Sequence, residues 1–162
     1  DRGAYSNDSY NLGLALLASG SKTEAAVRFE RAVALDPLHE PAVTALGLLA
    51  AESGRLKEAV GWWSRAVEIA PNKFEPLKYL GMAKLRMGEP RSAEAFLTKA
   101  LSMAPDDPEI LSELGAAHAK QGGFRKAADF FARSLDRNPG DAETRYNLKI
   151  AIRQIKKNNL AP

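Results

Sequence analysis

The sequence predicts an all-α fold in which four helical hairpins stack along the chain and one further helix closes the stack. Two observations predict the stack. Glycines recur 34 residues apart, and prolines keep the same interval: Gly13, Gly47, Gly81 and Gly115, with Pro37, Pro71, Pro105 and Pro139. A second glycine set (Gly20, Gly54, Gly88, Gly122) holds that register without an insertion. A period near 34 residues is typical of repeats that each contact only their neighbours.

Each repeat is predicted to be a pair of helices. Around Gly47, small and apolar residues share the i, i+3, i+4, i+7 spacing of one helix face: Val43, Leu46, Gly47 and Ala50. Ala59, Trp63 and Ala66 continue that pattern on a second helix. Gly54 lies where the first helix must stop, and Pro71 ends the second because proline has no N–H. The same offsets predict repeats at 6–39, 40–73, 74–107 and 108–141, within a single domain that spans 1–162.

The segment 142–157 is predicted to be a capping helix. Lys149 stands where the four repeats place glycine, and Arg145 stands where they place an early apolar residue. Both charges can face water if no second helix follows on that side. Residues 158–162 are expected to form a tail beyond the cap.

These residues resemble the tetratricopeptide repeat. The family's Leu-Gly, Gly, Ala, aromatic, Ala and Pro positions are matched in the first repeat by Leu12, Gly13, Gly20, Ala25, Phe29, Ala32 and Pro37, and the other repeats follow. The departures are Leu97 for the aromatic residue and Ser134 for alanine, and no repeat carries the family's early tryptophan. The resemblance implies a right-handed α-α superhelix, or solenoid, whose first helices line a concave face.

The resemblance also implies which residues look into that face. They lie six and three before each anchor glycine, and one, four and five after it. The predicted partner-binding residues are Tyr10, Leu14, Leu17, Thr44, Leu48, Lys78, Met82, Leu85, Arg86, Ala116, Lys120, Tyr146 and Ile150. The predicted floor is apolar, one edge is acidic (Glu75, Glu109, Glu143) and the other is partly basic. The helix dipole alone favours such charged edges, and some apolar residues can instead be buried between helices.

Two known activities of the family are not supported. The chaperone carboxylate clamp needs several basic and asparagine side chains, but Lys78 is the only groove lysine at the right offset. Met82 stands where the clamp has asparagine, and Glu109 stands where it needs a base. An asparagine ladder is also missing, since only Asn11 and Asn147 fall at its offset.

Composition excludes several other functions. The chain has no cysteine, and its net charge of +3 comes from mixed signs, which argues against nucleic acid as a partner. Its longest apolar stretch, 43–51, falls far short of the roughly 20 residues that a membrane-spanning helix needs. His39 and His118 have no cysteine or carboxylate at ligand spacing. We therefore expect no metal, no cofactor, no catalytic residue and no enzymatic activity.

The leading functional prediction is a scaffold that binds a protein or peptide segment in a partly apolar concave groove. Two alternatives stay open. One is a self-associating module that forms homo-oligomers. The other is a regulatory or docking part of a larger enzyme, which the first residue, Asp1, suggests because no initiator methionine precedes it. A cytoplasmic location is the default expectation.

Overall fold

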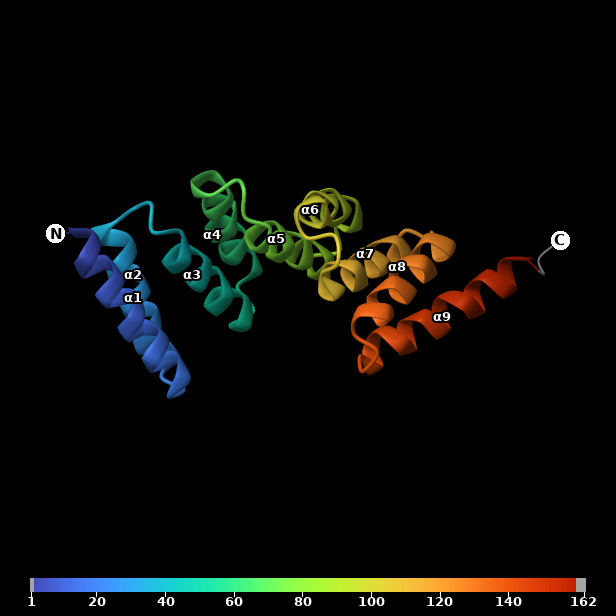
Figure 1. Cartoon of the computed structure of the whole chain (residues 1–162), viewed down its shortest axis with the longest axis horizontal. Helices are drawn as coiled ribbons and strands as arrows, with labels where there is room; N and C mark the ends of the chain where they lie inside the picture. Colours follow the sequence, from blue (N-terminus) through green and yellow to red (C-terminus); the bar gives the residue numbers. More distant parts are fainter. Residues whose placement is uncertain (1, 160–162) are drawn as a thin grey trace. The chain divides into compact units, whose positions relative to one another are not determined.

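The computed structural model describes residues 2–159, which form nine helices and no strand (Figure 1). The chain divides into two compact units, Asp1–Asn72 and Lys73–Pro162. The first unit holds α1 (Arg2–Ala18), α2 (Lys22–Leu35), α3 (Glu40–Glu52) and α4 (Leu56–Ile69). The second holds α5 (Glu75–Arg86), α6 (Pro90–Met103), α7 (Pro108–Lys120), α8 (Phe124–Arg137) and α9 (Ala142–Asn159). The predicted fold class is confirmed: helical hairpins followed by a C-terminal helix.

The four hairpin turns share one backbone conformation. At the first turn Gly20 has a φ of +86°, a left-handed conformation that only glycine adopts at no steric cost. The N–H of Gly20 donates to the carbonyl of Leu17, and the N–H of Ser21 donates to that of Leu16. These two bonds satisfy carbonyls that the end of α1 would otherwise leave unpaired. The second glycine set therefore marks where each first helix ends.

The first glycine set allows the two helices of each hairpin to approach closely. A Cβ atom added at Gly13 would lie 2.6 Å from Cε1 of Phe29, and one added at Gly115 would lie 2.5 Å from Cε1 of Phe131. Such separations are shorter than van der Waals contact, so no larger residue fits without a shift. In these two hairpins the aromatic ring of the second helix occupies the space that the glycine leaves on the first, and at Gly81 the side chain of Leu97 does so.

Prolines mark helix boundaries in two ways. Pro37, Pro71, Pro105 and Pro139 each lie two residues after the last residue of a second helix. Four further prolines lie within the first turn of α3, α5, α6 and α7, where a missing N–H costs nothing. Asp107 caps α7 by accepting a hydrogen bond from the N–H of Ile110 at 2.9 Å.

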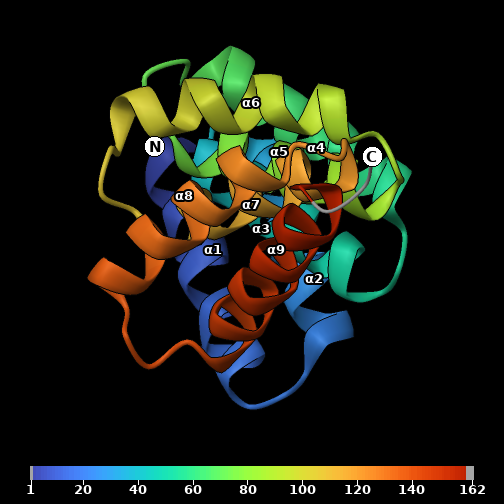
Figure 2. The same ribbon diagram turned by 90° about the vertical axis from the view of Figure 1, so that its right-hand side faces the viewer.

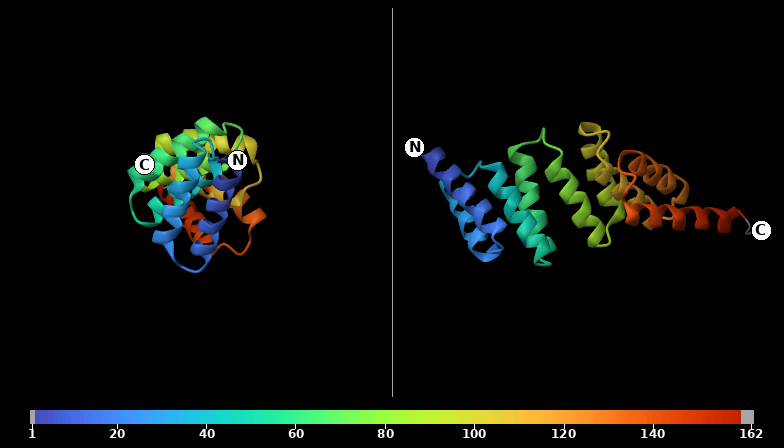
Figure 3. Two further views of the ribbon diagram at one scale, coloured as in Figure 1. Left: turned by 90° about the vertical axis from the view of Figure 1, so that its left-hand side faces the viewer. Right: turned by 60° about the horizontal axis from the view of Figure 1, so that its bottom comes forward.

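The first unit has a continuous apolar core. Its buried members come from α2, α3 and α4: Ala25, Phe29, Ala32, Val33, Ala42, Val43, Leu46, Leu49 and Ala66. Helix α1 contributes half-buried side chains that pack against this core, among them Tyr10, Leu16 and Leu17. The right-hand view of Figure 3 shows α1 and α2, in blue, lying side by side as one hairpin.

In the second unit each helix packs on the next, and α9 packs on α8 (Figure 2). Ala127, Phe131 and Ala151 form the buried cluster at this contact. Ser134, which replaces the family's alanine, is fully buried and donates its hydroxyl proton to the carbonyl of Pro108 at 2.7 Å. Helix α9 continues through Asn158 and Asn159. The rest of the tail expected at 158–162 lies outside the described residues.

No helix within residues 2–159 combines the length and the apolar character needed to cross a membrane.

Candidate functional site

The predicted contacts of the first unit lie on α1 and α3. Leu14 and Leu48 are exposed, at 41% and 37% of their surface. Tyr10 and Leu17 are half-buried and pack against the core of the unit. Thr44 donates its hydroxyl proton to a carboxylate oxygen of Glu40 at 2.6 Å. Two leucines therefore offer apolar surface, whereas the polar group of Thr44 is already engaged inside α3.

The predicted contacts on α5 divide by burial. Arg86 is exposed and Met82 is half-buried, whereas Lys78 and Leu85 are buried. The ammonium of Lys78 lies 2.6 Å from Oε2 of Glu109 and 3.7 Å from Oδ2 of Asp107. It also lies over the rings of Phe74 and Tyr79, at 5.9 Å and 5.6 Å from their centroids. The charge of Lys78 is therefore engaged within the unit, where it joins α5 to the start of α7.

Two opposed effects set the pKa of Lys78. Burial by itself lowers the pKa, because it disfavours the charged ammonium. The hydrogen bond to Glu109 and the negative charges of Glu109 and Asp107 outweigh burial and raise the pKa above its ordinary value of 10.5. Lys78 therefore carries its charge throughout the neutral pH range.

Three predicted contacts, from α7 and α9, line one pocket. Ala116, Lys120 and Ile150 surround a cavity of about 310 Å³ together with Ala119, Phe124, Phe131, Glu143, Asn147 and Ala151. Helices α7, α8 and α9 all contribute to this cavity, which we call the α7–α9 pocket. Most of its lining is alanine, phenylalanine and isoleucine, and its charged members are Lys120 and Glu143. Tyr146, the remaining predicted contact on α9, is 64% exposed and lies outside the lining.

A second cavity, of about 330 Å³, lies at the first turns of α7 and α9. Four carboxylates contribute to its lining: Glu109, Glu113, Asp141 and Glu143. Pro108, Ser112, Asn138 and Thr144 complete the lining, and we call this cavity the acidic pocket. Glu143 belongs to both cavities, so the acidic pocket adjoins the apolar one.

Hydrogen bonds hold one side of the acidic pocket in place. Asp141 accepts from the N–H of Thr144 at 3.0 Å and from its hydroxyl at 2.6 Å, which caps the start of α9. These bonds from Thr144 lower the pKa of Asp141 below its ordinary value of 3.8. The hydroxyl oxygens of Ser112 and Thr144 lie 2.7 Å apart and join α7 to α9. Asp141 and Thr144 therefore fix the wall of the pocket.

Glu113 is the acid of this pocket whose negative charge is least favoured. Burial raises its pKa above the ordinary 4.5, and the negative charges of Glu109 and Glu143 raise it further. Arg86 and Lys78 act in the opposite direction but do not outweigh burial. The carboxylate of Glu113 therefore sits in surroundings that disfavour its negative charge.

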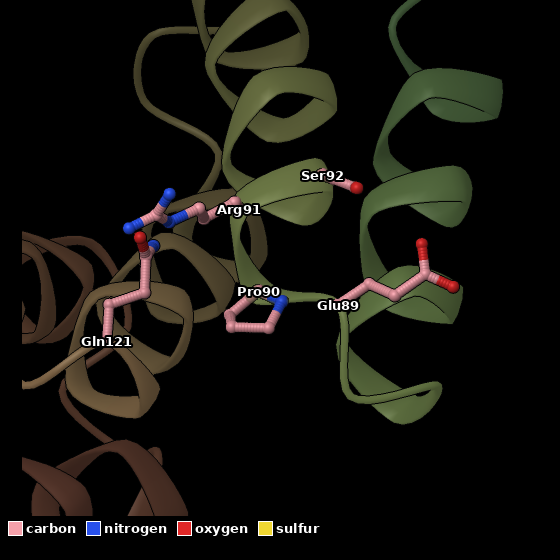
Figure 4. A pocket seen from close by; sticks show the side chains of 5 residues that line it. All are labelled: Glu89, Pro90, Arg91, Ser92 and Gln121. Carbon is pink, nitrogen blue, oxygen red and sulfur yellow. The ribbon is translucent and has the colours of Figure 1, made fainter.

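A third cavity, of about 470 Å³, lies at the start of α6 and the end of α7 (Figure 4). It is lined by Glu89, Pro90, Arg91, Ser92 and Gln121, none of which the sequence predicts as a partner contact. The amide of Gln121 donates to Glu94 at 2.7 Å and so ties these helix ends together. Few apolar side chains line this cavity, which makes it a weaker candidate for peptide binding than the α7–α9 pocket.

Both histidines have structural contacts. The Nδ1 atom of His39 accepts from the N–H of Ala42, and its Nε2 lies 3.0 Å from Oδ1 of Asn7, so the ring caps α3 and reaches α1. His118 is buried and stacks on Phe130 with the ring centroids 5.4 Å apart. Among residues 2–159, no three histidine or carboxylate side chains come together as a group that could hold a metal ion.

Sequence reasoning missed part of this site. Phe124, Glu113 and Phe131 were not among the predicted contacts. The offsets counted from each glycine cover the first helices alone, whereas Phe124 and Phe131 lie on α8, a second helix. Glu113 could have been suspected from its spacing, because it lies one helix turn after Glu109 on α7.

Comparison with known proteins adds family and fold to this geometry. A model of the tetratricopeptide repeat family matches residues 10–73 and 80–142. A crystal structure of MamA protein superposes with a TM-score of 0.85 at 18% identity, covering 95% of this chain and 84% of MamA. MamA residues 41 to the end, from Desulfovibrio magneticus RS-1, superpose with a TM-score of 0.82 at 18% identity, covering 97% of this chain and 94% of that one. YrrB, described as a TPR protein with an unusual peptide-binding site, superposes with a TM-score of 0.78 at 21% identity, covering 91% of this chain and 76% of YrrB.

At these sequence identities, the similarity to MamA and YrrB concerns the fold alone. No curated protein is similar enough in sequence to be counted as a relative of the chain.

Proposed function

Because this chain belongs to the tetratricopeptide repeat family, we propose that it is a scaffold whose role is to bind a segment of a partner protein. The α7–α9 pocket is the place where we expect it to hold that segment. The observation that carries the proposal is the convergence of Ala116, Lys120 and Ile150 on one apolar cavity. YrrB, whose fold is similar, is itself described as having a peptide-binding site.

The volume of the pocket suits one or two apolar side chains of the partner segment, which we call its apolar anchor. Ligand pockets begin at about 300 Å³, and this one measures about 310 Å³, which is room for one or two side chains. The half-buried Ala116 and the 36%-exposed Ile150 would lose further surface to a bound side chain. Burial of apolar surface at about 25 cal/mol per Å² supplies the driving force. An affinity near the micromolar range, or about −8 kcal/mol, is typical of such a contact.

Ile150→Asp tests this proposal, with Ile152→Asp as its matched control. Both isoleucines lie on α9 and both are partly exposed, at 36% and 42%, but only Ile150 lines the pocket. Random displayed peptides would be selected on the intact chain, and their affinities measured by calorimetry. Ile150→Asp is expected to abolish binding, whereas Ile152→Asp leaves it unchanged. Equal binding by all three proteins, or no selected peptide at all, would refute the proposal.

Self-association is a second candidate function, favoured by apolar side chains exposed in the first unit. Tyr5, Val27 and Leu38 expose 63%, 58% and 71% of their surface. Exposed apolar side chains of this kind can form an interface between two copies when they gather into one patch. Sedimentation at high concentration tests the idea, and a purely monomeric chain would count against it.

A further inference from the structure

We infer that the segment held by the α7–α9 pocket carries a lysine or arginine beside its apolar anchor, and that this cation docks in the acidic pocket. The inference rests on the proposed function and adds the chemistry of the partner. It follows from the two cavities taken together, because they share Glu143 as a common wall. A segment that fills the apolar cavity can therefore extend directly into the acidic one.

The charges around the acidic pocket do not cancel. Lys78 lies between Glu109 and Asp107, so its single positive charge offsets only part of their two negative charges. Asp141 receives two hydrogen bonds from Thr144. Glu113 and Glu143 remain, and the pKa of Glu113 is raised although Arg86 acts on it from α5. A guest cation placed between these two carboxylates would lower the electrostatic free energy of the site.

The acidic pocket does not have the arrangement of a metal site. Within residues 2–159 its carboxylates do not form a group that could hold a metal ion. A long cationic side chain does not need such convergence, because it can reach each carboxylate through separate N–H donors. The chemistry of the pocket thus fits an arginine or lysine side chain.

The spacing of the two cavities limits the sequence of the guest. Along α9 the acidic pocket is reached at Glu143, and the apolar pocket extends to Ile150, seven residues later. Seven residues of helix rise by about 10 Å. An extended segment covers that distance in about three residues, at roughly 3.3 Å for each. We therefore expect the cation within about three residues of the apolar anchor.

The test compares selected peptides and a charge-matched pair of variants of the full chain. Peptides are selected on the intact protein and depleted on Ile150→Asp, which leaves those that use the α7–α9 pocket. Their binding is then measured with Glu113→Gln/Glu143→Gln and with the control Asp129→Asn/Asp136→Asn. The control removes the same charge from exposed positions on α8 that lie outside both pockets. Thermal melting of each variant checks that it is folded.

We expect the selected peptides to share a lysine or arginine near an apolar residue. Removing Glu113 and Glu143 should weaken their binding by about tenfold, and the control pair should not change it. Replacing the peptide's basic residue by glutamine should cause a similar loss. Lowering the pH through the raised pKa of Glu113 should weaken binding more for the intact chain than for Glu113→Gln, because protonation of Glu113 removes a charge that holds the cation.

Two results would overturn the inference in distinguishable ways. The inference would be refuted, and the proposed function left intact, by peptides that depend on Ile150 but lack a basic residue. Peptides that bind Glu113→Gln/Glu143→Gln as tightly as the intact chain would have the same consequence. A selection that yields no Ile150-dependent peptide would refute the proposed function itself.

Discussion

The ammonium of Lys78 lies 2.6 Å from Oε2 of Glu109, which joins α5 to the first turn of α7 across 31 residues of sequence. The sequence predicted Lys78 as a contact for a partner. Its geometry gives it a structural role as well, because Asp107 and the rings of Phe74 and Tyr79 also surround it. The carboxylate of Glu109 is half-exposed, so the pair is partly screened by water.

Replacing Lys78 by methionine should lower the free energy of unfolding by about 1 kcal/mol at pH 8, since Glu109 and Asp107 lose their partner. The folded state raises the pKa of Lys78, so the stabilisation is fully present below the ordinary 10.5 and is lost as the pH rises through the folded value. The difference between the variant and the intact chain should therefore shrink above pH 10.5. Denaturant titrations at pH 8 and above pH 10.5 measure this difference in unfolding free energy. Lys99→Met, at an exposed position on α6, is the control.

Glu113→Gln is expected to stabilise the chain at neutral pH. The folded state raises the pKa of Glu113, so its contribution is most favourable below the ordinary 4.5 and is lost as the pH rises through the folded value. Above the folded pKa of Glu113 the intact chain holds a half-buried negative charge that glutamine removes. Thermal melts at pH 7 and pH 4 should show a gain in Tm at the higher pH that disappears at the lower. A loss of stability at pH 7 would contradict the account.

Two glycines of the first unit should respond to alanine with opposite signs. A Cβ at Gly47 would lie 2.6 Å from Cδ1 of Trp63, so Gly47→Ala should destabilise the chain by about 1–3 kcal/mol. Gly61 lies inside α4 with nothing within 4 Å of an added Cβ, so Gly61→Ala should stabilise it by about 0.5–1 kcal/mol. Denaturant unfolding of both variants measures the difference, and equal effects would be inconsistent with close helix packing at Gly47.

His39→Ala should cost about 1–2 kcal/mol of stability, because the start of α3 loses its cap and Asn7 loses its partner. His39→Asn should recover part of that loss, since asparagine can accept the hydrogen bond from the N–H of Ala42 but is too short to reach Asn7 in the same way. Chemical denaturation of the two variants separates the roles. If asparagine gave no recovery, capping would not be the main contribution of His39.

The fold could be predicted because backbone geometry itself repeats. Gly20 ends a helix through its positive φ, and Gly13 makes room for the ring of Phe29. Both positions require glycine, and glycine at a fixed spacing can be recognised in the sequence. Ser134 shows the limit of this reasoning. It was noted only as a departure from alanine, whereas its hydroxyl bonds to the carbonyl of Pro108, 26 residues away.

The candidate site was predictable only in part. The offset rule selected Ala116, Lys120 and Ile150, which line one pocket, because it identifies one face of a first helix. It also selected Lys78 and Leu85, which are buried, because it takes no account of the neighbouring helix. The charge pairing of Lys78, for example, joins it to Asp107 and Glu109 on another helix. That information lies in the packing of helices and cannot be obtained from a periodic pattern.

Glu143 borders both the apolar and the acidic pocket, so in the proposed binding mode a change at this residue should alter the affinity for the anchor and for the cation together. Glu113 and Ile150 each border only one. A designer who wishes to redirect the chain to a new ligand can therefore change charge preference at Glu113 and anchor size at Ile150 as independent adjustments, and should leave Glu143 untouched.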